Sequence, residues 1–389
     1  MLVLDVTWWV VALCLVKKTL WRVLISLFIV AQIAAVTNEL LGRLGYNAID
    51  MSLHAPEAAL ATAVIWSNLG LAAFGVLGLL YLCVRIFQRF RARPVASLAP
   101  APSSTNSLTR RQFLGTCAVA APPLLTFGLT GIALGQLSQF RLRRFDLAIP
   151  SLPKALDGLT IAHISDMHVG EWTHGRILRD LVSATNDLRA DIIVLTGDLI
   201  NYELSDLPEA LSLIKQMQSR YGVWMVEGNH DLYENGMEFE RRVKASGVPL
   251  LLDEAETVNI RGCPVQMLGI RWMEGIGKYR DHVTDTQVRG LMCQRHPDAF
   301  PIFLAHHPHT FDAAVKVGLP LTLTGHTHGG QLMLDKDLGI GPVLFRYWSG
   351  HYQNGTSQLV VSNGVGNMFP IRINAPAEIA KITLHCGVT

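Results

Sequence analysis

Beyond residue 150, five short apolar runs each end in polar side chains, and this pattern limits the possible folds more than any other feature. The runs are LTIAHIS, DIIVLTG, GVWMVEG, FPIFLAH and LTLTGH, which begin at residues 159, 191, 222, 300 and 321. Their length and continuous apolar character predict buried strands. Apolar residues recur at helical spacing between them, in Gly175–Arg189, Leu207–Arg220 and Met237–Ala245. This alternation predicts an α/β domain with helices covering the sheets.

Each of the five runs leads into side chains that can bind metals. Sites in α/β proteins form just beyond the carboxyl ends of strands, so we expect these side chains to lie together. Carboxylates and imidazoles without thiolates suit Mn, Fe or Zn. The donors are too many for one tetrahedral zinc ion, and they fit two ions roughly 3.5–4 Å apart with a bridging carboxylate.

These motifs resemble those of the calcineurin-like metallophosphoesterases. The series D-x-H, GD, GNH, a single H and GHxH occurs in that order between residues 166 and 328. The resemblance covers about residues 150–386 and is closest to a membrane-anchored bacterial branch, through SDMH, GNHD, GHTHGGQ and the tail VSNGVGNMFPIRINAPAEIAKITL. It implies an α-β-β-α sandwich phosphoesterase domain, preceded here by an N-terminal helical membrane segment.

The resemblance also assigns roles to individual side chains. Seven are implied as ligands of two divalent ions: Asp166, His168 and His328 for the first, Asn229, His306 and His326 for the second, and Asp198 as the bridge. The implied reaction is in-line attack of metal-bound hydroxide on the phosphorus of a phosphate ester.

His230 is implied as the proton donor or transition-state stabiliser at the leaving oxygen, with Asp231 as a possible orienter of its ring. His307 and His309 remain alternatives to His306 as a ligand. Many members of the family have an aspartate that supports the catalytic histidine at the position of Asn201. Support for His230 must therefore come from elsewhere.

The first third of the chain is basic and apolar. Residues 1–149 contain 13 Lys and Arg against 5 Asp and Glu, a balance of +8, whereas the remainder contains 20 against 26, a balance of −6. Residues 58–84 and 112–140 are uncharged and exceed the roughly 20 residues that cross a bilayer. With the shorter candidates Val23–Val36 and Val3–Val16, we predict two or three transmembrane helices in residues 1–93 and a transmembrane or signal-anchor helix at 112–140.

Residues 94–111 read as a flexible basic linker. The sequence TRRQFLG at 109–115 resembles a bacterial twin-arginine export signal, although Gly115 replaces the usual lysine and the site is internal. Two more arginines in a basic loop are the simpler alternative. Basic residues before the span 112–140 favour a cytoplasmic loop. We therefore expect a multi-pass protein of the bacterial inner membrane, with the domain 145–389 in the periplasm and the twin-arginine translocase as a partner.

The motifs leave the substrate open among phosphate monoesters, diesters and pyrophosphates. We expect a phosphodiester and favour a lipid-linked one, since the domain follows a membrane span. One alternative is a pyrophosphatase of a nucleotide-linked lipid such as UDP-diacylglucosamine, and another is a catalytically silent membrane receptor or scaffold. Arg346 and Tyr347, within the loop Leu334–Tyr352, are candidate substrate-binding residues, and Met273–His282 is a second candidate loop. Nucleic acid is not expected as a partner, because the net charge of −6 gives the domain no broad positively charged surface.

Overall fold

The computed structural model describes residues 2–16, 18–43, 57–91, 110–137, 139–273 and 277–387. The chain divides into two compact units, Met1–Leu134 and Gly135–Thr389. The predicted linker 94–111 lies outside the described residues, except for Arg110 and Arg111, which begin helix α5 (Arg110–Leu137).

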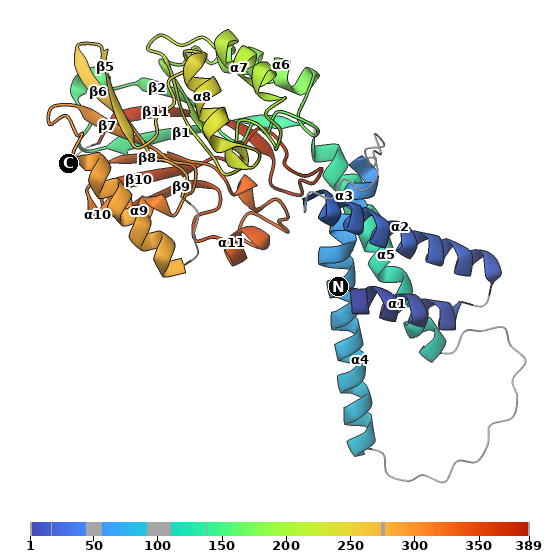
Figure 1. Cartoon of the computed structure of the whole chain (residues 1–389). Coiled ribbons are helices and arrows are strands. Elements are labelled where there is room, and N and C mark those ends of the chain that lie inside the picture. The colour runs from blue at the N-terminus through green and yellow to red at the C-terminus, as the bar shows by residue number, and fades with distance from the viewer. Residues whose placement is uncertain are drawn as a thin grey trace, which may run out of the picture. The chain divides into compact units, whose positions relative to one another are not determined.

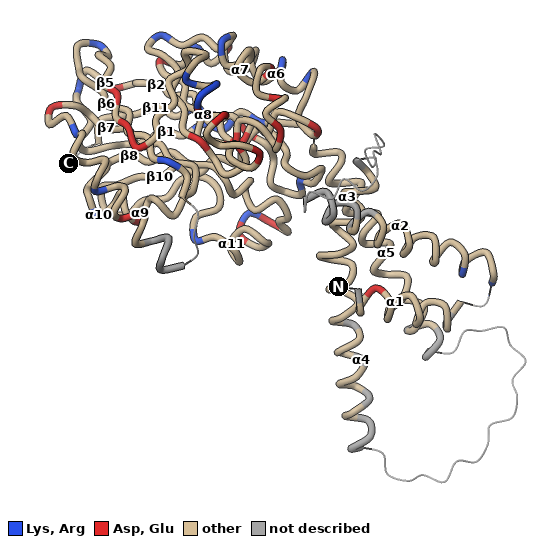
Figure 2. The backbone as a smooth tube through the Cα atoms, in the orientation of Figure 1, with Lys and Arg blue, Asp and Glu red and all other residues tan. Residues whose placement is uncertain are grey.

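Apolar helices make up the described part of the N-terminal unit. They are α1 (Leu2–Leu15), α2 (Thr19–Arg43), α3 (Glu57–Ile65), the π-helical turn η1 (Trp66–Gly70), α4 (Leu71–Arg91) and most of α5. Figure 2 shows few charged residues along them. Two stretches, Ala58–Val84 and Gly115–Leu137, are long and apolar enough to cross a membrane, whereas Val3–Cys14 and Thr19–Ala34 are shorter. Length and composition therefore support two of the predicted spans.

The boundary between α5 and the C-terminal domain corrects two predictions. The helix ends at Leu137 rather than at residue 140, and strand β1 (Phe140–Ile149) begins at once. Over its whole length β1 pairs in parallel with β11 (Ala377–Cys386), so the domain begins before residue 145. The reason is the alternating sequence FRLRRFDLAI, because an alternating pattern suits a strand with one buried face and not a membrane helix.

Two sheets form the centre of the domain. The first has the order β1-β11-β2-β3-β4 and adds the strands β2 (Leu159–Ile164), β3 (Ile192–Thr196) and β4 (Val223–Val226). The second has the order β5-β6-β7-β8-β10-β9, with β5 (Glu254–Ile260), β6 (Cys263–Gly269), β7 (Phe300–Leu304), β8 (Leu321–Thr324), β9 (Gly350–Asn354) and β10 (Ser357–Val361). The five predicted strands are confirmed as β2, β3, β4, β7 and β8.

Helices cover the outer face of each sheet, as Figure 1 shows. The helices α6 (Arg176–Asp187), α7 (Leu207–Gln216) and α8 (Gly236–Ala245) pack on the first sheet. The helices α9 (Gly277–Met292) and α10 (Thr310–Lys316) pack on the second. Between the sheets lies a core that includes Ile161, Val194 and Trp224 from one side and Met267, Ile302 and Leu323 from the other. The predicted α-β-β-α sandwich is confirmed.

Strand direction brings the motif loops together. β2, β3 and β4 are parallel to one another, and so are β6, β7, β8 and β10. Parallel neighbours end at the same edge of their sheet. The two edges are joined by His306 after β7, whose Nδ1 lies 2.6 Å from the carbonyl oxygen of Thr196 at the end of β3. The loops after five strands therefore meet at one place.

Candidate metal centre

The loops after the five strands place the implied ligands around one centre. Asp166 and His168 follow β2, Asp198 follows β3, and Asn229 follows β4. His306 follows β7, and His326 and His328 follow β8. Three sets of side chains offer ligand atoms that all lie within 4.8 Å of one another: Asp166, His168 and His328; His168, Asp198 and His230; and Asp198, His306 and His326.

The first set is fully buried and compact. The Nε2 atoms of His168 and His328 are 3.0 Å apart. His328 Nε2 lies 3.3 Å from Asp166 Oδ1. Neutral imidazoles that face each other in this way and also face a carboxylate have lone pairs directed at one point, which is the arrangement a cation requires.

The second set, as the term is used below, is Asp198, His306 and His326, and its Asp198 also faces His168 of the first set. His306 Nε2 lies 3.1 Å from Asp198 Oδ2 and 3.2 Å from His326 Nδ1. The same Asp198 Oδ2 lies 3.6 Å from Nε2 of His168. One carboxylate therefore faces both sets, as a bridging ligand would.

Asn229 has a buried oxygen that suits a second cation. Its Nδ2 donates a hydrogen bond to the hydroxyl of Tyr233 at 2.8 Å. Its Oδ1 is buried and has no hydrogen-bond partner among the described residues. An unsatisfied buried carbonyl oxygen is costly unless something outside the protein chain binds it. The donors of this site fit two divalent ions.

The backbone is strained at the ligands. Non-glycine residues seldom adopt positive φ, yet five of the seven implied ligands do so: Asp166 (53°), His168 (43°), Asp198 (54°), His326 (72°) and His328 (49°). Strained conformations of this kind persist where many surrounding contacts hold them, and they cluster at functional sites.

Two glycines allow the ligand loops to approach closely. A Cβ atom added at Gly228 would overlap Oδ1 of Asp198. One added at Gly325, which directly precedes His326, would overlap the side chains of Ser165 and Asp166. Glycine is required at both positions because any side chain would displace a metal-binding carboxylate.

Burial and nearby charge set the protonation of the site. Burial holds the pKa of His168 and of His328 well below the ordinary value, so both rings are neutral and able to bind a metal. Burial would raise the pKa of Asp198, but His306 and the neighbouring imidazoles outweigh it and hold that pKa well below its usual range. Burial lowers and Asp198 raises the pKa of His306, to about 9. A cation bound by His306 therefore replaces the imidazole proton.

His230 is held by main-chain groups. Its Nδ1 donates to the carbonyl oxygen of Asn201 at 2.7 Å, and its backbone N–H donates to Asp198 Oδ1 at 2.8 Å. Its ring lies edge-on to that of His168, with centroids 4.5 Å apart. At the position where many family members have a supporting aspartate, the His230 ring is thus held by the backbone carbonyl of Asn201.

Both oxygens of Asp231, the possible orienter of His230, accept hydrogen bonds from the main chain. One oxygen of Asp231 accepts hydrogen bonds from the backbone N–H groups of Leu199 and Ile200, at 2.8 and 3.1 Å. The other accepts from the N–H of Gly228 at 2.9 Å. Asp231 therefore fastens the loop after β4 to the loop after β3, which places Asp198.

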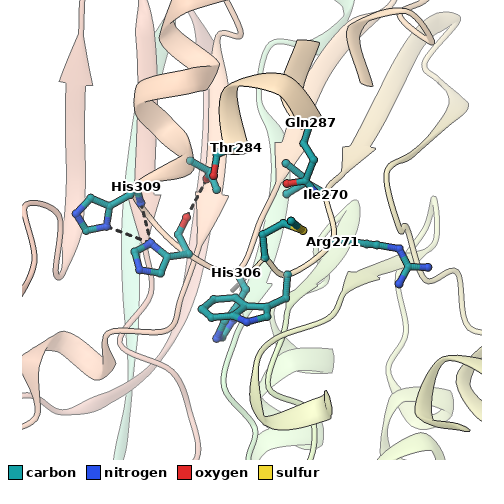
Figure 3. Close-up of a pocket in the computed structure, with 10 residues that line it drawn as sticks. Ile270, Arg271, Thr284, Gln287, His306 and His309 are labelled. Carbon is teal, nitrogen blue, oxygen red and sulfur yellow. Dashed lines mark hydrogen bonds between the residues drawn. The ribbon is translucent and has the colours of Figure 1, made fainter. Parts of the chain in front are cut away.

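A pocket beside the second set is drawn in Figure 3. It is lined by His306, His307, His309, Arg271 and Trp272, among others. The Trp272 ring lies 5.0 Å from His326 and 5.4 Å from His306, centroid to centroid. Its Nε1 is buried and has no partner among the described residues. His306 belongs to the metal-binding sets, whereas His307 and His309 contact each other, with Nδ1 atoms 3.1 Å apart.

The two candidate substrate-binding residues are engaged elsewhere. The Tyr347 hydroxyl donates to Asp312 Oδ1 at 2.8 Å, and Arg346 Nη1 lies 3.1 Å from Asp312 Oδ2. Tyr347 also packs in an apolar cluster with Phe311 and Leu359. Residues 274–276 of the other candidate loop lie outside the described residues.

Sequence reasoning missed Arg372, which is completely buried behind the first set. Its Nη2 lies 3.3 Å from Nδ1 of His328 and donates to the carbonyl oxygen of Gly366 at 2.6 Å. Arg372 stands in a loop after the last strand–motif unit, where no periodic pattern marks it. The available signal was its place in the tail VSNGVGNMFPIRINAPAEIAKITL, which carries part of the family resemblance but assigns Arg372 no role.

Comparisons with known proteins point to the same family as the sequence motifs. Residues 159–330 match the family model for calcineurin-like phosphoesterases. The chain is 30% identical over 249 residues to a "Transmembrane protein with metallophosphoesterase domain" of Danio rerio, over 61% of this chain and 56% of that protein. It is 28% identical over 295 residues to an "Uncharacterized metallophosphoesterase" of Bacillus subtilis (strain 168), over 71% of this chain and 98% of that protein. The chain thus spans little more than half the length of the zebrafish relative.

Proposed function

Residues 159–330 belong to the calcineurin-like phosphoesterases, a family of phosphoric ester hydrolases, and on this premise we propose that the chain is a two-metal phosphodiesterase. The observation that carries the proposal is the position of Asp198 between two groups of donors: Asp166, His168 and His328 on one side, and His306 and His326 on the other. The unsatisfied Oδ1 of Asn229 supports a ligand role in the second set. Asp166, His168 and His328 would hold one ion, and Asn229, His306 and His326 the other.

The donor set suits Mn, Fe or Zn. When bound, two such ions supply an activated water and neutralise charge on the phosphoryl group. The protein contributes the geometry, because Asp198 is held by its hydrogen bond from the His230 N–H and by the close approach of Gly228. Positioning of this kind supplies much of the rate enhancement in phosphoryl transfer.

His230 is the proposed proton donor to the leaving oxygen. Its Nδ1 faces the carbonyl of Asn201 as a donor, so as a general acid the ring would be doubly protonated and would transfer the proton of Nε2. The ring is buried and lies against Tyr202 and Tyr233, with centroids 5.1 and 4.6 Å away. These contacts fix the orientation of the ring, as proton transfer to a positioned substrate oxygen requires.

The substrate class rests on the pocket and on the chain that precedes the domain. The Trp272 indole N–H is a donor without a partner among the described residues, beside two ligands of the second ion, and we propose that it binds a non-bridging substrate oxygen. A phosphodiester attached to a lipid is the proposed substrate, since the domain directly follows the candidate span Gly115–Leu137.

The location is proposed on the same grounds. Two helices meet the criterion for membrane spans, and two relatives are named transmembrane proteins. We place the chain in a bacterial inner membrane as a multi-pass protein, with the domain in the periplasm after export by the twin-arginine translocase. Changing Arg110 and Arg111 together to lysine should leave the domain resistant to protease added outside spheroplasts. Unchanged cleavage would refute this export route.

The full chain, purified in detergent, tests the hydrolase proposal. We expect about two metal ions per chain and Mn²⁺-dependent release of nitrophenol from bis(4-nitrophenyl) phosphate, faster than from the monoester. Asp198→Asn should reduce the rate by at least about 100-fold, the usual size of a lost group that positions transition-state charge. Asp180→Asn makes the same chemical change at an exposed residue of α6 and should leave the rate unchanged.

Other outcomes would redirect the assignment. Two bound ions without hydrolysis of either ester would favour a pyrophosphate substrate, which an assay with a nucleotide-linked lipid such as UDP-diacylglucosamine would check. Bound metal with no hydrolysis of any of the three would favour a receptor or scaffold. A chain that takes up no divalent ion after reconstitution would refute the proposal.

A further inference from the structure

We propose that the segment Leu334–Leu344 and the basic pocket beside it form a membrane-docking surface. The exposed apolar side chains of the segment enter the bilayer interface, and the pocket binds the phosphate of an anionic lipid headgroup. This inference concerns binding and not hydrolysis, and it requires only that the helix before the domain crosses the bilayer.

The apolar part of this surface is unusual for a folded domain. Four large apolar side chains are exposed within eleven residues: Leu334 (74%), Leu338 (58%), Val343 (81%) and Leu344 (64%). Elsewhere in the described part of the C-terminal unit, only Leu142, Tyr233 and Met237 are large hydrophobics of comparable exposure. Contiguous exposed apolar groups mark sites of interaction with a partner or a membrane.

The basic part is a cavity of about 380 Å³ next to this segment. Arg141, Arg143 and Lys336 line it together with apolar groups that include Trp348. Arg141 Nη2 lies 2.8 Å and Arg143 Nη1 3.4 Å from the carboxylate of Glu378, which is completely buried. Asp337 also lines the pocket and pairs with Lys336 at 3.0 Å. Two guanidinium groups share the single carboxylate of Glu378, so this wall of the pocket keeps a charge of about +1.

The position of the surface follows from its contacts with the last turn of α5. The backbone N–H of Asn374 donates to Oε1 of Gln136 at 3.0 Å. The side chain of Asn374 lines the pocket and donates to the carbonyl oxygens of Met333 and Leu334, at 3.0 and 3.1 Å. Asn374 therefore links the pocket and the start of the apolar segment to Gln136, one of the residues by which the chain enters the C-terminal unit.

This combination fits a lipid headgroup better than a soluble anion. Apolar side chains beside lysine and arginine are typical of protein surfaces that lie in the interface of a membrane. Basic residues directly beside a span attract anionic lipids. Lys336 stands within the apolar segment between Asp335 and Asp337, and its Nζ lies 3.0 Å from Asp337 Oδ2. The positive charge of the surface therefore comes mainly from Arg141 and Arg143, while the leucines enter the interface.

Hydrogen–deuterium exchange of the full chain in lipid nanodiscs tests the apolar part. We expect the amides of 334–344 to exchange several-fold more slowly in nanodiscs containing phosphatidylglycerol than in neutral detergent micelles. Val343→Asp should abolish this protection. Met237→Asp is the matched control, because Met237 is 82% exposed on α8, away from the segment, and its change should leave the protection intact.

Native mass spectrometry of lipid retained by the full chain tests the pocket. Arg141→Gln should lower retention of phosphatidylglycerol about fivefold. Arg143 then remains beside Glu378, so the variant should fold. Arg144→Gln removes the same charge from the opposite face of β1 and should leave retention unchanged.

Three results would overturn the proposal. The first is equal protection of 334–344 in Val343→Asp and the unmodified chain. The second is equal retention of phosphatidylglycerol and phosphatidylcholine, or an equal loss in both arginine variants. The third is that inorganic phosphate in lipid-free micelles protects the segment as well as phosphatidylglycerol does, which would make the pocket a soluble-anion site. Each readout is independent of hydrolysis, so failure here and failure of the phosphodiesterase proposal can be told apart.

Discussion

Arg372 offers the sharpest test of how the protein supports its metal centre. The guanidinium is completely buried and donates to four acceptors within 3.1 Å: the carbonyl oxygens of Gly366, Ala375 and Asn363, and Oδ1 of Asn367. The N–H of Gly366 in turn donates to the carbonyl oxygen of Asp166 at 2.8 Å. Arg372 thus holds the loop against which the first set of ligands is placed.

Replacing Arg372 by methionine keeps an unbranched apolar chain but removes every donor. A hydrogen bond from a charged group contributes about 1.5 kcal/mol, so the four short bonds together contribute about 6 kcal/mol. Burial of the cation has a cost, which shows in the pKa of Arg372, lowered to about 10. Methionine avoids this cost, and the gain offsets part of the lost hydrogen bonding. The net loss of stability should be about 3–5 kcal/mol, the usual result of removing one partner from a buried charged network.

Thermal unfolding of the metal-loaded full chain measures this loss. For a unit of this size we expect Tm to fall by about 10 °C, and metal content to fall from two ions towards one. Arg346→Met is the control, because Arg346 is 63% exposed and its ion pair with Asp312 contributes little. A drop in Tm no larger than that of the control would refute the argument that Arg372 supports the site.

Three further substitutions test the ligand loops. Gly228→Ala should lower metal content, since its Cβ would overlap Asp198, and metal analysis of the purified variant is the check. Asn229→Ala should leave one tightly bound ion per chain, whereas two retained ions would remove Asn229 from the ligand set. Asn201→Ala keeps the carbonyl that holds His230, so kcat on the diester should stay within about twofold, which is within about 0.4 kcal/mol. A larger loss would show that the side chain matters.

The strands at the centre of the domain were predictable to within a residue or two. β2, β3, β4, β7 and β8 are buried on both faces, so each reads as a continuous apolar run that ends abruptly at polar residues. The strand-end rule then predicts that their loops meet. The rule does not require knowing which sheet each strand joins, because every motif loop follows the carboxyl end of its strand.

Strands with exposed faces were missed for the converse reason. β5, with the sequence EAETVNI, alternates polar and apolar residues at the sheet edge. Such a short pattern does not distinguish a strand from a loop. β1 lies directly after an apolar helix, and its arginines resemble the basic flank of a membrane span. Only its pairing with β11, more than 230 residues later, establishes that it is a strand.

Roles that depend on main-chain atoms could not be read from side-chain motifs. Asp231 stands beside His230 in GNHD, and adjacency suggested that one orients the other. In the structure the carboxylate binds the amides of Leu199 and Ile200, and the His230 ring binds the carbonyl of Asn201. Both partners belong to the loop after β3, so the two roles appear only once that loop is placed against the next.

Backbone strain connects these observations. Left-handed conformations at five ligands cost roughly 1–3 kcal/mol each, and the loops must therefore be held by bonds that do not depend on a cation. Asp231 ties the loop of Asn229 to that of Asp198, and Arg372 holds the loop behind Asp166. Both are buried ionisable side chains that bind main-chain atoms and are themselves absent from the implied ligand set. A site built in this way keeps its donors in place before metal arrives, so metal affinity is not reduced by the free energy of arranging them.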